Sequence, residues 1–239
     1  MQNLAPGTRG TPQAGQSTGS GLPHSAQNFA VAGVASPHDG HVMIRSMALH
    51  QASRTPLGQS GGMVEVVVAD DAGFAAQVLA AVRAMTFAAF TGRFDEHDWE
   101  HTYGGVRVVA LADGVPVATG AVVSRRLLAG EREVRVGYVE GVATALDRQG
   151  SGLGTAVMRA VAEVIRDRYE LGALSTSAHA FYEGLGWERW HGPTYVRDGD
   201  TVLRTEDEDD GIMVLRHGPS AEIDLTQALT CEARPGDDW

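Results

Sequence analysis

The hexapeptide Gln149-Gly150-Ser151-Gly152-Leu153-Gly154 follows an apolar, strand-like stretch and leads into a segment of helical periodicity. A turn between a strand and a helix N-terminus presents free backbone N–H groups together with the positive end of the helix dipole. Glycine lets the chain turn sharply there, and it lets a ligand come close to the main chain. We therefore predict an anion site at this turn, suited to a phosphate or pyrophosphate.

A glycine-rich turn of this kind can also be no more than a tight strand-to-helix connection. The stretch before it, 132–144, continues a predicted antiparallel meander, so the turn does not open the βαβ unit of a dinucleotide-binding fold. No Gly-Lys-Ser/Thr sequence follows, which excludes a P-loop. An anion site of another kind and a plain turn both remain open at this point.

The segments on either side of the turn have clear periodicity. Leu153, Val157 and Val164 fall on one helical face, which predicts a helix from the turn to about residue 169. Further upstream, Asp113-Gly114 separates two apolar stretches and predicts a two-residue hairpin. The chain therefore passes from a strand meander into a helix at the glycine turn.

The same patterns predict the other elements. Asp70 is a candidate N-cap for the first helix. Strands are expected at 64–69, 106–112, 115–128, 132–144, 171–175, 194–204 and 212–216, and helices at 71–90, 95–101, 153–169 and 178–184. This order predicts an α/β fold with a mixed, mostly antiparallel sheet of about six to seven strands and helices on both faces.

Composition divides the chain of 239 residues into two parts. Residues 1–62 are rich in Gly, Ser, Pro and Gln and poor in large apolar side chains, so we predict a disordered tail without a targeting signal. Residues 63–239 have dense apolar periodicity and form one predicted domain, and Met63 is a candidate start of the protein. No apolar run approaches the roughly 18 residues that a membrane span needs.

Charge and cysteine content narrow the possible partners. A net charge of −11 disfavours nucleic acid and anionic membranes and favours a cationic small molecule, although acidity can also serve solubility alone. The single cysteine, Cys231, rules out an internal disulfide and an all-cysteine metal site. We therefore predict a cytoplasmic protein.

Two landmarks in this order resemble the GNAT acetyltransferases. The first is Gln149-x-x-Gly152-x-Gly154 after the apolar Gly141-Val142-Ala143-Thr144, and the second is the aromatic stretch Phe181-Tyr182-Glu183-Gly184-Leu185-Gly186-Trp187. The resemblance implies an enzyme that uses acetyl-CoA and no metal, with the pyrophosphate at the glycine turn.

The chain is more closely similar to the aminoglycoside 2′-N-acetyltransferases of actinobacteria, from about Phe90 onward. The segments that carry this likeness are 98–102, 137–142, 171–175, 190–194, 209–211 and 236–239, which read Asp-Trp-Glu-His-Thr, Gly-Tyr-Val-Glu-Gly-Val, Leu-Gly-Ala-Leu-Ser, Trp-His-Gly-Pro-Thr, Asp-Asp-Gly and Gly-Asp-Asp-Trp. This likeness implies acetylation of the 2′-amine of aminoglycosides, resistance to them, and a homodimer.

The resemblance also assigns roles to particular residues. Glu140 is expected to be the general base, and Tyr182 the acid that protonates the departing thiolate. Either side chain can instead be structural, Glu140 as an ordinary strand residue and Tyr182 as part of the core. The residues expected to bind acetyl-CoA are Val142, Ala143, Thr144, Gln149, Gly150, Ser151, Gly152, Leu153 and Gly154, with a bulge exposing the backbone of the first three.

A polyamine substrate needs several opposing carboxylates. By resemblance the residues expected to bind it are Asp98, Glu140, Ser175, Asp209, Asp237 and the carboxylate of Trp239. The acidic run 206–210 is otherwise read as a solvated loop, with one or two of its residues at the ligand. Arg93 stands where the family pattern has an acidic residue, which bears on the substrate range. The stretch 178–182 is shorter than in the family, which bears on the position of the phenol.

Three other functions fit parts of the sequence. The pattern His-x-x-Glu-His of inverted zinc proteases occurs at His97-Asp98-Trp99-Glu100-His101. A zinc site there would need a third ligand, and two exposed histidines on a polar helix are the plainer interpretation. A GNAT enzyme acting on a metabolite amine, an amino sugar or a peptide keeps the fold and changes the acceptor. A non-catalytic acetyl-CoA-binding protein is disfavoured because Glu140 and Tyr182 are both present.

Overall fold

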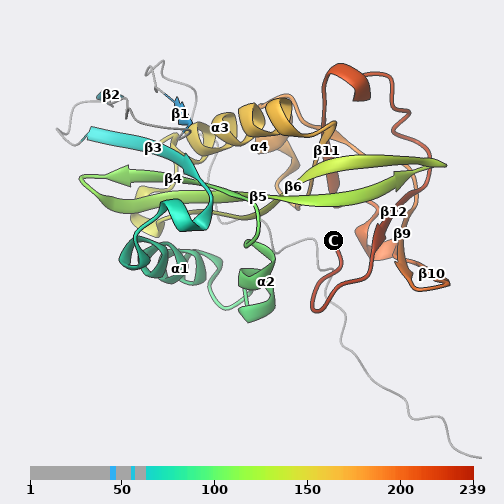
Figure 1. Ribbon diagram of the computed structural model, residues 1–239, viewed down its shortest axis with the longest axis horizontal. Coiled ribbons are helices and arrows are strands. Elements are labelled where there is room, and N and C mark those ends of the chain that lie inside the picture. Colours follow the sequence, from blue (N-terminus) through green and yellow to red (C-terminus); the bar gives the residue numbers. More distant parts are fainter. Residues whose placement is uncertain (1–43, 47–54, 57–62) are drawn as a thin grey trace, which may run out of the picture.

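The computed structural model describes residues 44–46, 55–56 and 63–239 as one twisted sheet with helices on both faces (Figure 1). The helices α1 (Ala76–Phe90) and α2 (Glu96–His101) lie on one face, and α3 (Leu153–Arg168) and α4 (His179–Glu183) lie on the other. Within these described residues, no helix is long and apolar enough to cross a membrane.

The centre of the sheet is an antiparallel meander. Its strands are β3 (Met63–Ala69), β4 (Val106–Ala112), β5 (Val115–Ala129) and β6 (Arg132–Thr144), each paired with the next. The parallel neighbour of β6 is β7 (Leu171–Ser175), followed by β11 (Ile212–Arg216) and β8 (Glu188–Arg189). Because β6 and β7 are parallel, the chain must cross over between them, and α3 makes that crossover.

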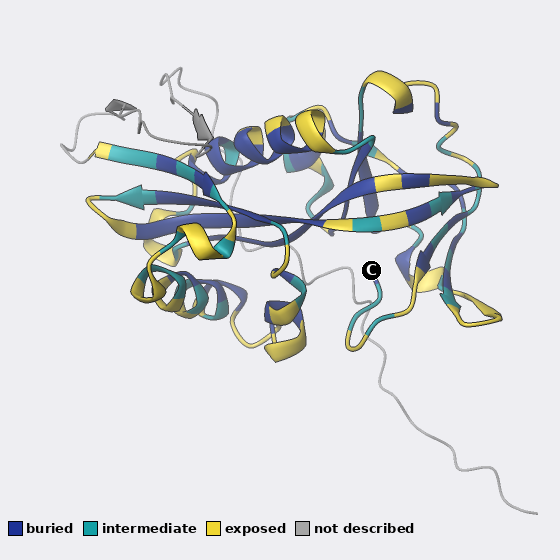
Figure 2. Ribbon diagram, viewed as in Figure 1, coloured by how far each residue is buried: buried dark blue, intermediate teal, exposed yellow. Residues whose placement is uncertain are grey.

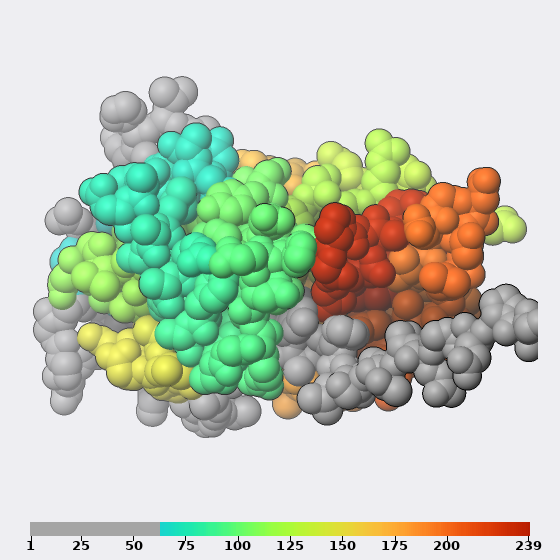
Figure 3. All heavy atoms as spheres, turned by 90° about the horizontal axis from the view of Figure 1, so that it is seen from below, coloured from blue at the N-terminus to red at the C-terminus, as the bar shows by residue number. Residues whose placement is uncertain are grey.

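A second group of strands covers the far end of the long β5–β6 ribbon. The strands β9 (Thr194–Asp198) and β10 (Thr201–Arg204) form a hairpin, and β12 (Leu229–Glu232) runs parallel to β9. The last residues of β5 pair with β12, which joins this group to the main sheet. The segment 234–239 then returns from β12 toward α2, and Figure 3 shows it between α2 and the β9–β10 region.

Among the described residues, buried apolar side chains form three clusters, and Figure 2 colours the buried parts of the ribbon dark blue. One cluster packs α3 against the meander and holds Leu153, Val157 and Tyr182. A second lies under α1 and α2 and includes Phe90 and Trp99. The third fills the space between the β5–β6 ribbon and the β9–β12 group. The sheet is thus covered on both faces, as the element order predicts.

Most predicted elements are confirmed, with two corrections. The predicted helix 71–90 begins only at Ala76, because Asp70 caps a separate 3-10 turn through a bond from the Gly73 N–H of 3.0 Å. The predicted strand 194–204 is two strands, because the chain reverses at Gly199, whose φ is +56°. Both segments contain a local turn signal that periodicity alone does not reveal.

The sheet also has more strands than the six or seven predicted. The extra strands β8 and β12 are too short for a period-2 pattern, and β9 and β10 replace one predicted strand. Within the predicted tail, β1 (Ile44–Ser46) and β2 (Thr55–Pro56) pair with β3. The rest of the tail lies outside the described residues, so its disorder remains a prediction.

Candidate active site

The glycine turn leads directly from the end of β6 into α3. Gly150 and Gly152 have φ values of +75° and +83°, and α3 begins at Leu153. Among the described residues, no side chain caps this helix and no acidic residue lies in its first turn. The amides of the first turn therefore remain available to an anion.

Gly152 is required by its backbone conformation. A Cβ added to Gly152 would have no described atom within 4 Å, so crowding by the protein does not select glycine at this position. The φ of +83° selects glycine, because residues with a Cβ rarely adopt that region of backbone conformation. The open space beside Gly152 is where the predicted anion would approach.

The strands β6 and β7 separate just before this turn. Their parallel register ends at the pair Tyr138–Ala173, whereas β6 continues to Thr144 and β7 to Ser175. On the β5 side, the register shifts between Thr119 and Ala121, where β6 has one extra residue. That bulge contains Gly141, with a φ of +59°. The predicted bulge is therefore present, and the end of β6 diverges from β7.

Glu140 lies immediately before the bulge and is almost fully buried. Its side chain is 6% exposed, and its Oε1 accepts a hydrogen bond of 2.8 Å from Nη1 of Arg234. Burial raises the pKa of Glu140, and the Arg234 guanidinium opposes that rise. This buried carboxylate is thus an ion-paired base candidate and not the ordinary surface residue of the alternative interpretation.

Arg234 is a functional candidate that the sequence analysis missed. Its Nε donates to the carbonyl oxygen of Asp237 at 2.6 Å, and its Nη2 donates to the main-chain carboxylate of Trp239 at 3.4 Å. It thereby joins Glu140 to two of the residues predicted to bind substrate. A contact across 94 positions of sequence leaves no local pattern, and only the presence of an arginine in the 234–239 segment points to it.

Tyr182 is fully buried at the end of α4. Its ring packs edge-on against Trp187, with the ring centroids 6.0 Å apart, and it belongs to the same cluster as Val142 and Leu153. Burial raises the pKa of the Tyr182 hydroxyl, so the phenol stays protonated at neutral pH. The structure therefore makes the side chain of the predicted acid part of the core, in the cluster that also contains Val142 of β6.

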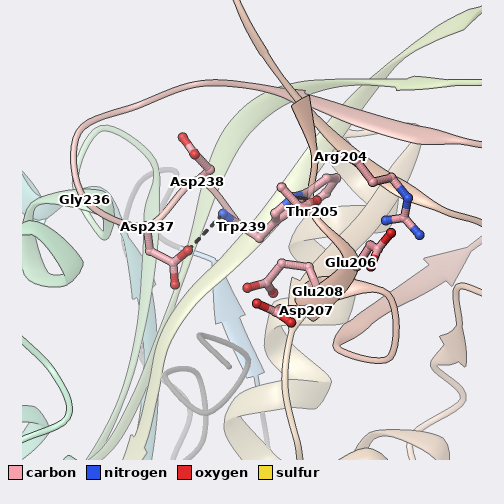
Figure 4. A pocket seen from close by; sticks show the side chains of 9 residues that line it. All are labelled: Arg204, Thr205, Glu206, Asp207, Glu208, Gly236, Asp237, Asp238 and Trp239. Carbon is pink, nitrogen blue, oxygen red and sulfur yellow. Dashed lines mark hydrogen bonds between the residues drawn. The ribbon is translucent and has the colours of Figure 1, made fainter. Parts of the chain in front are cut away.

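An acidic cleft of about 490 Å³ opens between the loop before β11 and the segment 234–239. Figure 4 shows the carboxylates of Asp207 and Glu208 on one side of it and that of Asp237 on the other. Its lining consists of residues 204–208 and 236–239. Five carboxylates around one cleft favour a ligand with several positive charges.

The predicted substrate residues occupy different positions around this cleft. Ser175 donates from Oγ to Glu208 at 3.3 Å, so it reaches the cleft through a residue the sequence analysis did not single out. Asp237 and Trp239 line the cleft directly. Asp98 lies in α2, where it accepts from the backbone N–H of Asp95 at 2.8 Å, and burial raises its pKa.

Asp209 is not among the residues that line the cleft. Its carboxylate accepts from the backbone N–H and the hydroxyl of Thr194, both at 2.9 Å, and from the guanidinium of Arg204. The Arg204 hydrogen bond is the main reason that the pKa of Asp209 is lowered. In this structure Asp209 holds the start of β9, whereas its neighbours 206–208 line the cleft.

The two histidines of the zinc-protease pattern lie against the segment 234–239. Nε2 of His101 is 2.8 Å from the carbonyl oxygen of Pro235, and a Cβ on Gly236 would come within 2.7 Å of the Cβ of His97. A zinc site needs a third ligand, and no group of three or more His, Cys, Asp or Glu suited to a metal occurs among the described residues.

Two solved structures follow a chain path similar to that of this protein. One is Escherichia coli ElaA, with 14% identity and a TM-score of 0.47 over 65% of this chain and 100% of that chain. The other is a GNAT family acetyltransferase from Brucella melitensis in complex with acetyl-CoA, with 17% identity and a TM-score of 0.46 over 69% of this chain and 94% of that chain.

Comparisons of the sequence identify a family and a relative. Residues 79–187, from α1 to the aromatic stretch after α4, match the acetyltransferase (GNAT) family. A curated protein of Mycolicibacterium fortuitum, named aminoglycoside 2′-N-acetyltransferase, is 46% identical over 161 residues, which cover 66% of this chain and 83% of that protein. With the glycine turn, the diverging strands and the buried Glu140 in place, this chain belongs to the aminoglycoside 2′-N-acetyltransferase family of the GNAT acetyltransferases.

Proposed function

We propose that this acetyltransferase transfers the acetyl group of acetyl-CoA to the 2′-amine of aminoglycosides and thereby confers resistance to them. One observation carries the proposal: an acidic cleft, suited to a polycationic sugar, is connected to the buried Glu140 through Arg234. The Mycolicibacterium fortuitum relative bears the same activity in its name.

GNAT enzymes use acetyl-CoA, and three features of this chain fit that cosubstrate. The uncapped start of α3 suits the pyrophosphate, which the amides of 149–154 would hold. The diverging end of β6 suits the pantetheine arm along Val142 and Ala143. Finally, the buried hydroxyl of Thr144 lacks a hydrogen-bond partner among the described residues, and a ligand atom would supply one.

The acceptor must become a neutral amine before it can attack. Glu140 takes one proton from the acceptor ammonium, directly or through a water molecule. Acetyl-CoA supplies a thioester, so the nitrogen–carbon bond forms as the carbon–sulfur bond breaks. Backbone N–H groups of 142–144 would bind the carbonyl oxygen as it gains charge.

The departing thiolate needs a proton, and Tyr182 is the proposed donor. The phenol is protonated at neutral pH because burial raises its pKa. The new amide nitrogen releases its second proton, which restores the phenol, while Glu140 passes the first proton to solvent. The products are then the amide, the thiol of coenzyme A and one proton.

Substrate binding is assigned to the residues around the cleft. Asp237 and Trp239 line it, and Ser175 reaches it through Glu208. Asp98 lies in α2, and its carboxylate is electrostatically coupled to that of Asp237. Asp209 remains a candidate with an indirect role, because it fixes the loop next to Glu208.

The position of the new acetyl group tests this function. Tobramycin would be incubated with the protein and acetyl-CoA, and the product would be analysed by two-dimensional NMR. We expect the acetamide carbonyl to correlate with the proton at carbon 2′. An acetyl group on another nitrogen would overturn the proposed regiochemistry.

We propose three further properties. A homodimer is expected from the family, and β10 presents the exposed Val202 and Leu203 that an interface would cover. A cytoplasmic location agrees with a single, buried free cysteine. The negative net charge disfavours nucleic acid and anionic membranes as partners.

A further inference from the structure

Arg234 is the most extensively bonded side chain around the base. Its side chain is 16% exposed, and its three donor nitrogens point in three directions: to Glu140, to Asp237 and to Trp239. Its backbone N–H also donates to the carboxylate of Asp238, at 2.8 Å. The residue therefore fixes the fold of the 234–239 segment and the position of the Glu140 carboxylate at once.

The ion pair with Arg234 counteracts the effect of burial on the ionisation of Glu140. A carboxylate removed from water tends to hold its proton, and a protonated Glu140 cannot act as a base. A guanidinium within hydrogen-bond distance favours the ionised form, and its planar geometry restricts the carboxylate to few orientations. The residue that supplies this guanidinium, Arg234, lies 94 positions away in sequence.

We propose that Arg234 is a positioning residue that keeps Glu140 ionised and oriented. Glu140 can then accept a proton only when the 234–239 segment is folded against it. This inference rests on the proposed function, because it assumes that Glu140 takes the acceptor proton. Arg234 itself need not touch the acceptor. It acts through the carboxylate that it holds.

Other charged or titratable groups around Glu140 come from β5, β6, α2 and the segment 234–239. Arg125 of β5 lies 4.8 Å from the centre of the Tyr138 ring and donates to the Glu232 carbonyl oxygen at 3.2 Å. Asp237 disfavours the ionised form of Glu140, and Tyr138 on β6 also interacts with it electrostatically. Asp98 and His101 of α2 interact electrostatically with Arg234. Only Arg234 both forms an ion pair with Glu140 and anchors the 234–239 segment, among the residues described.

The test compares Arg234→Met, Arg234→Lys and a control, Arg126→Met. Arg126 also forms an ion pair, with Glu133 at 2.9 Å, but on the exposed face of the ribbon. In Arg234→Met, the acid limb of the kcat/KM profile should move up by about one pH unit or more, because an opposing charge is lost. At a pH below the acid limbs of both proteins, each unit of upward shift lowers the ionised fraction of Glu140 about tenfold.

Arg234→Lys retains the charge and loses the forked contact with the main-chain oxygens of Asp237 and Trp239. Its acid limb should stay within about 0.3 unit of the wild type, while kcat falls. Arg126→Met should leave both quantities unchanged. An unmoved acid limb in Arg234→Met would overturn the proposal. If that variant does not fold, a full-unit shift in Arg234→Lys would overturn it as well.

A second measurement separates this inference from the proposed function. The carboxyl carbon of Glu140 can be followed by ¹³C NMR during a pH titration of the wild type and the Arg234 variants, with Glu140→Gln to assign the signal. We expect the midpoint in Arg234→Met to lie at least about one unit above that of the wild type. This readout needs no acceptor, so it stays valid if no aminoglycoside is acetylated, whereas equal midpoints would refute the role of Arg234 alone.

Discussion

At Glu140, burial raises the pKa of the carboxyl group, and the ion pair with Arg234 lowers it. Replacing Glu140 by Gln preserves the shape and an acceptor oxygen for Arg234 but removes the group that accepts the proton. We expect kcat for aminoglycoside acetylation to fall by about 100-fold or more. The affinity for acetyl-CoA should change little, since the glycine turn is untouched. Steady-state kinetics and calorimetric titration with acetyl-CoA would measure both, and an unchanged kcat would remove Glu140 from the mechanism.

Single residues also show where prediction from sequence ends. Glu140 and Tyr182 could be predicted because they lie next to motifs that resemble a family. Arg234 and Glu208 could not, because their roles come from contacts between segments far apart in sequence. Asp209 shows the converse: resemblance names it, but Arg204 and Thr194 occupy its carboxylate here.

Among the elements, the turn before α3 makes the clearest prediction. Gly152→Ala places a Cβ at a φ of +83°, where no described atom lies within 4 Å. Gly114→Ala, in the β4–β5 hairpin, is matched to it, with a φ of +81° and the same open surroundings. Each should cost about 1–2 kcal/mol of stability, since the left-handed region disfavours a side chain.

Only the change at Gly152 should affect acetyl-CoA. The added methyl group lies where the pyrophosphate would approach, so we expect the KM for acetyl-CoA to rise about tenfold or more, which corresponds to about 1.4 kcal/mol. Gly114→Ala should leave that KM at the wild-type value. Chemical denaturation and initial-rate kinetics on both variants would decide, and equal KM values for the two variants would show that the turn does not bind the cosubstrate.

The long elements were predictable for a simple reason. The strand 132–144 and the helix after the glycine turn each contain enough residues to show their period, and both match the structure almost to the residue. The errors fall where the chain turns within an apparently continuous segment, at Phe74-Ala75 and at Gly199. Short strands such as β8 are fixed by their partners, so their own sequence contains no signal for them.

For the molecule as a whole, His101 links stability to pH. Burial is the main reason that its pKa is lowered to about 4 in the folded state, from an ordinary value of 6.5. Between these two pH values the unfolded chain binds a proton that the folded protein does not. The free energy of unfolding should therefore fall as the pH drops from 6.5 toward 4.

The variant His101→Gln isolates this contribution. One full proton would give a slope of about 1.4 kcal/mol per pH unit, and solvent screening of a half-buried ring makes the actual slope smaller. We expect the variant to lose less stability than the wild type in urea unfolding between pH 7 and pH 5. Equal slopes in the variant and the wild type would contradict the assignment to His101.

The central claim is acetylation of a 2′-amine, and release of free thiol from acetyl-CoA tests it most directly. Gentamicin and tobramycin carry a 2′-amine, whereas kanamycin A and amikacin carry a 2′-hydroxyl. Rapid thiol release with the first pair and none above background with the second is the result expected from the acidic cleft and the buried base. Thiol release that is absent with all four, or equal with all four, would contradict it.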